Sequence, residues 1–158
     1  MPDYSHLPPE KEAYFPLLVR SNYKVTSDPT AIYNCIAHAA EDSGRWWWPD
    51  DTAVGVFWPE GLPCEESIEA FIEAYQAVGY SVCDGDQLEV GFVKVAIYAD
   101  ADGVPMHAAR QLLSGSWTSK LGQWEDIEHT TPRDLEDNGE GLGYGTVTVI
   151  MKRCSKME

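Results

Sequence analysis

The chain has 158 residues, of which 26 are acidic and 11 are basic, so its formal net charge is −15. This charge repels phosphate backbones and anionic membrane surfaces, so we expect neither a nucleic-acid partner nor a membrane partner. A hydrophobic fraction of 44% argues against intrinsic disorder. The four cysteines form no CxxC pair, which excludes a zinc ribbon and a thioredoxin motif, and we expect no metal and no cofactor.

We expect one compact unit with no membrane-spanning helix and no signal peptide. No apolar run approaches the roughly 20 residues that a membrane-spanning helix needs. The first residues lack the basic start and apolar stretch of a signal peptide. We therefore predict a cytoplasmic protein with a single domain, 1–158, made of an N-terminal arm, 1–28, and a core, 29–158.

The first predicted elements are a short strand in the arm and a helix after it. The strand covers 23–25. Apolar residues then recur at helical spacing up to Gly44, at positions Ile32, Cys35, Ile36 and Ala39. Two starts are open for this helix: Asp28 as the cap before Pro29, or Asn34 as the cap before Cys35.

An aromatic segment, a second helix and several strands follow. The segment 45–59 is rich in Trp and serves either as a ligand platform or as additional core. The pattern at 66–78 predicts an amphipathic helix that ends at Gly79. Helices followed by antiparallel strands predict an α+β fold in which N-terminal helices pack on a small antiparallel sheet. The expected strands are 92–98, 105–112, 116–119 and 145–152.

Cys35 and His107 are the strongest catalytic candidates. A cysteine at a helix N-terminus is stabilised as a thiolate, and an imidazole on a later strand is suited to take its proton. Asp126 is the first choice to orient His107, with Ser119 and Gln123 as alternatives. The backbone N–H of Cys35 and the Asn34 side chain are the expected oxyanion donors.

Four stretches carry a resemblance. They are YNCIAHA (33–39), HAARQL (107–112), WTSKLG (117–122) and EDIEH (125–129). Over about 30–152 the chain resembles a bacterial domain family of unknown function. The order of cysteine, then histidine on a strand, is also similar to papain-like cysteine hydrolases, which implies a papain-like fold and a Cys–His site.

Other uses of these residues stay open. His38 lies three residues after Cys35 on the same helical face and is a competing base. Cys35 is also suited to be a buried thiol, and His107 a hydrogen-bonded strand histidine. Trp46, Trp47 and Trp117 are the expected substrate-binding residues. A zinc site of Cys35 and His38 with other Cys or His residues matches no familiar ligand spacing.

Two functions remain. The first is a cysteine-dependent hydrolase or acyl transferase in which Cys35, His107 and Asp126 act on an amide, isopeptide or thioester of a protein or small molecule. The second is a non-catalytic protein-interaction module, of accessory or immunity type, that uses the Trp-rich segment and the acidic surface.

Overall fold

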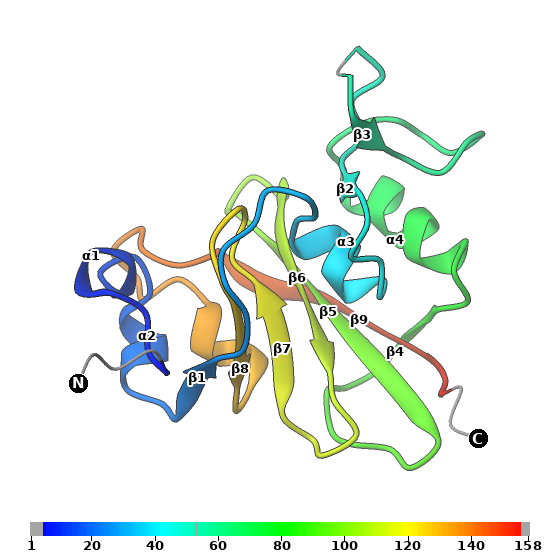
Figure 1. The fold of residues 1–158 in the computed structure, drawn as a ribbon. Helices are drawn as coiled ribbons and strands as arrows, with labels where there is room; N and C mark the ends of the chain where they lie inside the picture. The colour runs from blue at the N-terminus through cyan, green and yellow to red at the C-terminus, as the bar shows by residue number, and fades with distance from the viewer. Residues whose placement is uncertain (1–4, 53, 156–158) are drawn as a thin grey trace.

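A seven-stranded antiparallel sheet forms the centre of the molecule (Figure 1). The computed structural model describes residues 5–52 and 54–155. The strand order is β1-β8-β7-β6-β5-β9-β4, and every neighbouring pair is antiparallel. The strands are β1 (Tyr23–Val25), β4 (Ser81–Cys83), β5 (Phe92–Ala99), β6 (Pro105–Gln111), β7 (Trp117–Lys120), β8 (Asp126–His129) and β9 (Thr146–Cys154).

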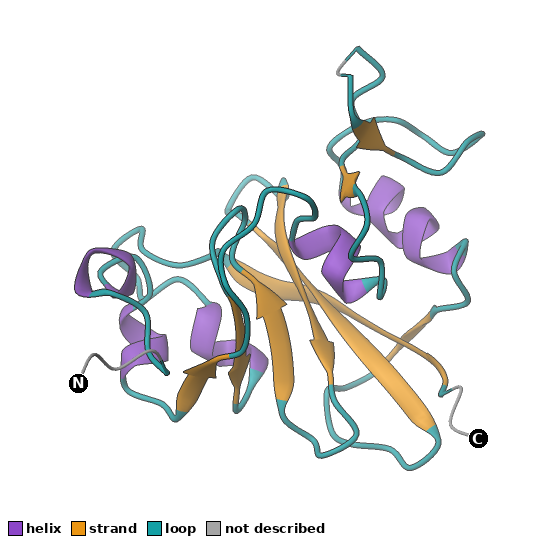
Figure 2. Ribbon diagram, viewed as in Figure 1, coloured by secondary structure: helices purple, strands orange, loops and turns teal. Residues whose placement is uncertain are grey.

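Short helices cover the two faces of the sheet, as the purple elements of Figure 2 show. On one face, α3 (Cys35–Ala39) and α4 (Ile68–Gln76) pack against the sheet in one hydrophobic cluster. On the other, the N-terminal segment and η1 (Pro132–Leu135) close a second cluster. That segment contains α1 (Pro9–Glu12) and α2 (Pro16–Val19). The fold is therefore a mixed α+β fold dominated by an antiparallel sheet, and its N-terminal helices are small.

The central strand β5 is buried on both faces, which explains its nearly continuous apolar sequence. Side chains alternate between faces along a strand, so Val95 and Ile97 join the α3–α4 cluster. Ala96 and Tyr98 join the cluster beneath α2 and η1. Both faces of β5 must therefore be covered by other elements. The helices α3 and α4 cover one face, and the N-terminal arm with η1 covers the other.

The Trp-rich segment forms a small projection beside α4 (Figure 1). Within it β2 (Trp46–Trp47) and β3 (Val56–Phe57) make a two-residue parallel pair. Trp48 and Trp58 both contact the Phe71 ring, with centroids 5.5 and 5.2 Å apart. These rings extend the core of the α3–α4 face.

The structure decides between the two predicted starts of the first helix. It begins at Cys35, after the Asn34 cap, and a start at Pro29 is wrong. Asn34 Oδ1 accepts hydrogen bonds from the N–H groups of Ala37 and Trp47, which stops the helix from extending toward Pro29. The predicted strand at 23–25 and the helix within 66–78 are confirmed.

Among the described residues, no helix is long and apolar enough to cross a membrane.

Candidate functional site

Cys35 lies at the first position of α3, as the sequence indicates, but its side chain is enclosed. The residue is 7% exposed and belongs to the α3–α4 hydrophobic cluster. Burial raises the pKa of its thiol to about 11, although the backbone N–H of Ala108 acts in the opposite direction. The thiol is therefore protonated at neutral pH.

His107 occupies the other side of β6. Its pairing partner is Tyr98, whose side chain lies in the cluster beneath η1, while the next residue, Ala108, packs in the α3–α4 cluster. The imidazole stacks on Tyr144 with ring centroids 4.2 Å apart. Neither ring nitrogen has a hydrogen-bond partner among the described residues, and burial lowers the pKa of His107 well below its ordinary value.

The structure therefore does not bring Cys35 and His107 together. Adjacent residues of a strand point to opposite faces, and α3 covers the face of Ala108. A Cys35–His107 proton transfer would have to pass through the strand. The predicted third residue, Asp126, also lies away from His107, beside His38 and Tyr33.

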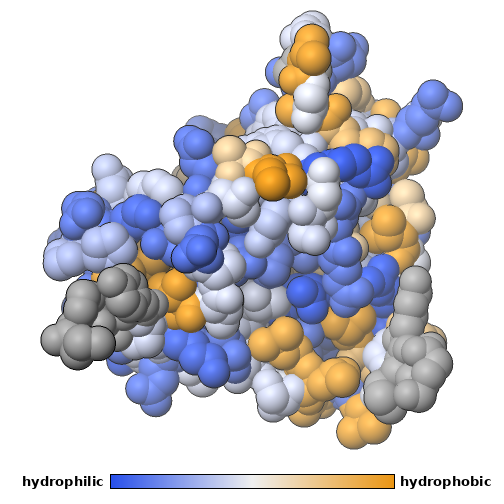
Figure 3. Space-filling model, in the orientation of Figure 1, coloured by the Kyte–Doolittle hydropathy of each residue, from blue (hydrophilic) through white to orange (hydrophobic). Residues whose placement is uncertain are grey.

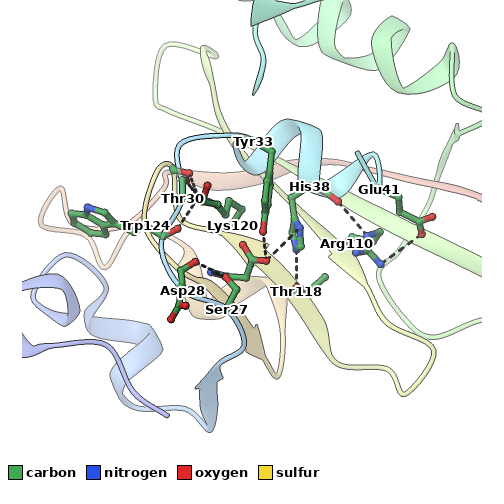
Figure 4. Close-up of polar contacts among 12 residues, drawn as sticks. Ser27, Asp28, Thr30, Tyr33, His38, Glu41, Arg110, Thr118, Lys120 and Trp124 are labelled. Carbon is green, nitrogen blue, oxygen red and sulfur yellow. Dashed lines mark hydrogen bonds and ion pairs between the residues drawn. The ribbon is translucent and has the colours of Figure 1, made fainter. Parts of the chain in front are cut away.

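Asp126, Tyr33 and His38 form a polar cluster at the edge of α3 (Figure 4). The Tyr33 hydroxyl donates to Asp126 Oδ2 at 2.7 Å, and this oxygen is 3.9 Å from His38 Nδ1. On the other side of the ring, His38 Nε2 is 2.9 Å from Thr118 Oγ1. His38 thus lies between a carboxylate and a hydroxyl, an arrangement used to activate nucleophiles.

This cluster opens into a cavity of about 390 Å³, lined by Tyr33, His38, Glu41, Asp42, Ser43, Arg110 and Asp126. Burial lowers the pKa of His38 to about 4, while the Asp126 carboxylate favours the protonated ring. Burial, with the hydrogen bond to Asp126, raises the pKa of Tyr33 to about 12. At neutral pH the cavity therefore offers a neutral imidazole, while the protonated Tyr33 phenol donates its hydrogen bond to Asp126.

The family model for DUF7689, a domain of unknown function, matches residues 24–152. The chain belongs to this family. The resemblance to a domain family of unknown function is thereby confirmed, and no papain-like family matches. No curated protein and no solved structure matches the chain.

In this DUF7689 domain the predicted oxyanion donor, Asn34, has a structural role. Its Oδ1 caps α3, and its Nδ2 donates to the carbonyl oxygen of Trp47 at 2.7 Å. Trp47 is itself 2% exposed in the α3–α4 cluster, and Trp117 is 2% exposed in the cluster on the opposite face. Trp46 is half-buried. The three predicted substrate-binding tryptophans therefore do not share a surface.

The alternatives for the third residue are also separate from Cys35 and His107. Ser119 Oγ is 2.8 Å from His129 Nε2 on the second face of the sheet. Gln123 is exposed in the β7–β8 loop. In the part of the chain that the structure describes, no three His, Cys, Asp or Glu side chains gather as a metal site, and Cys35, Cys64, Cys83 and Cys154 are free thiols.

Lys120 is a buried residue that links two backbone segments next to the site. Its ammonium group donates to the carbonyl oxygens of Thr30, Gly122 and Trp124 at 2.6–2.7 Å, although the residue is fully buried. It therefore joins the segment before α3 to the β7–β8 turn (Figure 4). This bridge holds Tyr33 and Asp126 on neighbouring segments.

Sequence reasoning missed Thr118, Tyr33 and Arg110 as members of the site. One signal was present, because alternation along the predicted strand 116–119 places Thr118 on the face opposite Trp117 and Ser119. The hairpin pairing of β7 with β8, which brings Asp126 alongside Lys120, was missed because the four-residue strand β8 was not predicted.

Proposed function

We propose that this DUF7689 domain is a hydrolase or acyl transferase for an amide, isopeptide or thioester, with Thr118 as nucleophile and His38 as general base. The observation that carries the proposal is the 2.9 Å approach of His38 Nε2 to Thr118 Oγ1, with the Asp126 carboxylate facing the other ring nitrogen. The cavity lined by His38, Arg110 and Asp126 has room for a small substrate or an extended side chain, although Thr118 itself is only 6% exposed.

The chemistry follows from the order of these groups. With its proton on Nδ1, His38 accepts the Thr118 proton at Nε2 while Thr118 Oγ1 bonds to the substrate carbonyl carbon. Asp126 stabilises the imidazolium, which then passes the proton to the leaving nitrogen or sulfur. Water, activated by the same ring, hydrolyses the acyl-threonine ester, or another nucleophile accepts the acyl group.

Arg110 is the best placed group for the developing oxyanion. It lines the same cavity, and its cross-strand neighbour is Thr118. Its Nε donates to the backbone oxygen of His38 at 3.4 Å, which holds the guanidinium beside the base. A fixed positive charge near a developing negative charge lowers the barrier to acyl transfer.

The cysteine route predicted from the sequence, including a papain-like arrangement, stays a competing proposal. It requires Cys35 to leave a hydrophobic cluster and His107 to move to the other face of β6. The threonine route uses a base, His38, that already borders the cavity, and a hydroxyl, that of Thr118, that already lies 2.9 Å from this base. We therefore favour the threonine route.

Hydrolysis of p-nitrophenyl acetate, followed by peptide mapping of the acetylated residue, tests the proposal. We expect acetyl transfer to Thr118, and a loss of about 100-fold or more in rate for Thr118→Val and for His38→Gln. The Cys35→Ala variant discriminates between the two routes. Loss of the rate in Cys35→Ala with an unchanged rate in Thr118→Val would overturn the proposal in favour of the cysteine route.

A second candidate, the protein-interaction module, is favoured by exposed apolar side chains at one end of the sheet. Leu88, Val90 and Leu113 are 47%, 97% and 65% exposed. Figure 3 shows apolar residues gathered at the lower edge of this face. Exposed apolar groups of this kind mark interaction surfaces. Equal, background rates in the native protein and in every variant would favour this second function.

A further inference from the structure

Two arginines from different strands converge on one carboxylate, that of Glu41. Arg110 Nη1 is 3.6 Å from Glu41 Oε1, and Arg153 Nη2 is 3.1 Å from Glu41 Oε2. The convergence follows from the register of the sheet. Arg110 pairs with Val95 and Arg153 with Val93 on the strand between them, so both guanidinium groups lie on the α3 side.

The arginines are fixed by groups other than Glu41. Arg153 Nη1 donates to the Val78 carbonyl oxygen at 2.6 Å, and its guanidinium carbon lies 4.5 Å from the centre of the Tyr80 ring. Arg110 Nε donates to the His38 carbonyl oxygen. The side chains of Arg110 and Arg153 are 18% and 10% exposed. The two cations would therefore keep their places without Glu41.

Glu41 is the replaceable member of this group. Its side chain is 45% exposed, and its φ of 65° is the only positive value for a non-glycine residue in the described chain. This conformation is unfavourable for a residue with a Cβ. Glu41 also borders two cavities, the site cavity and one of about 310 Å³ lined by Arg110 and Arg153. A ligand in either cavity can reach the position of its carboxylate.

We propose that Arg110 and Arg153 form a carboxylate-binding subsite that Glu41 occupies in the resting protein, and that its ligand is a small molecule or peptide end with a free carboxylate. Planar guanidinium groups bind carboxylates with two directed hydrogen bonds each, which suits them to this ligand class. The assignment of this ligand as the substrate rests on the proposed function, whereas binding itself does not.

Glu41 acts as an internal competitor in this scheme. The apparent affinity of an external carboxylate falls by the fraction of molecules in which Glu41 fills the subsite. The Glu41→Gln variant keeps the size of the side chain and removes the competing charge. We expect succinate to bind this variant about tenfold more tightly than the native protein, since an intramolecular competitor is removed.

Isothermal titration calorimetry of the full chain with succinate, and with neutral succinamide, provides the test. We expect heat of binding for succinate alone, tighter binding in Glu41→Gln, and unchanged binding in Glu60→Gln. Glu60 is an exposed glutamate, so its variant controls for the loss of one negative charge. Arg153→Gln, verified as folded by circular dichroism, is expected to lose succinate binding.

Two results would overturn the proposal: binding of succinamide equal to that of succinate, or equal succinate affinity in the native, Glu41→Gln and Glu60→Gln proteins. The Thr118→Val variant separates this inference from the catalytic one. Succinate binding by a native protein whose esterase rate is no higher than that of Thr118→Val would refute the catalytic proposal alone. A Thr118-dependent rate without succinate binding would refute the subsite alone.

Discussion

At the scale of single residues, the main question is the reactivity of Cys35. Its burial and raised pKa predict that iodoacetamide modifies the exposed Cys64 and Cys154 first and Cys35 only after unfolding. Because His107 lies on the other face of β6, His107→Ala is expected to leave the labelling rate of Cys35 unchanged. Mass spectrometry of the labelled peptides measures both. Fast labelling of Cys35 at pH 6 that slows in His107→Ala would instead indicate a working Cys–His pair.

The sequence left open whether Cys35 begins the helix and whether its thiol is buried, and the structure shows that both are the case. Alternation requires His107 and Ala108 to face opposite sides of their strand. Which of them faces α3 depends on how the helix packs on the sheet, and this is a long-range property. Ala108 has the small side chain that lets α3 approach, whereas His107 fits between Tyr98 and Tyr144.

At the scale of elements, the N-terminal caps of α3 and α4 can be compared by the number of hydrogen bonds that each cap side chain makes. Asn34 accepts from two backbone N–H groups and donates to the Trp47 carbonyl, so it joins α3 to β2. Ser67 caps α4 through one bond, to the N–H of Ala70. We predict that Asn34→Ala lowers the free energy of unfolding by about 2–3 kcal/mol and Ser67→Ala by about 1 kcal/mol. Urea denaturation measures both, and an equal loss would contradict the bridging role of Asn34.

The long strands were predicted from the sequence, as were the short strands β1 and β7, whereas the short strands β4 and β8 were not. The predicted strands 92–98 and 105–112 match β5 and β6 to within one residue at each end. The sequence of β5 contains strong β-formers, and a turn signal at 100–103 separates it from β6. The strands β4 and β8 and the helices of the arm have three or four residues each, too few to show a period. The strand β4 pairs with the distant β9, and β8 pairs both with its neighbour β7 and with the distant β1.

At the scale of the whole molecule, three buried histidines make stability depend on pH. The pKa values of His38 and His129 are lowered to about 4 by burial, and that of His107 is lowered well below its ordinary value. In the unfolded chain these rings titrate near 6.5, so the unfolded state binds more protons below that pH. The stabilisation is fully present above about pH 6.5 and is lost as the pH falls toward 4.

We predict that the free energy of unfolding falls between pH 7 and pH 5 with a slope of up to about 4 kcal/mol per pH unit, for three protons. Urea titrations at several pH values measure this slope. The variant His107→Phe, which preserves a ring to stack on Tyr144, is expected to reduce the slope by about a third. A free energy of unfolding that does not change over this range would show that the three rings have the same pKa values in the folded and unfolded states, which would contradict the lowered values.

In the proposed mechanism His38 is a neutral base whose Nε2 accepts a hydrogen bond from the Thr118 hydroxyl and whose protonated Nδ1 faces Asp126. Long-range proton–nitrogen NMR of the His38 ring at pH 6 tests it without any substrate. We expect a neutral ring with its proton on Nδ1 and an unprotonated Nε2, and a change in the Nε2 signal in Thr118→Val. A ring with its proton on Nε2, donated to Thr118, would contradict the claim, because His38 would then have no lone pair to take the Thr118 proton.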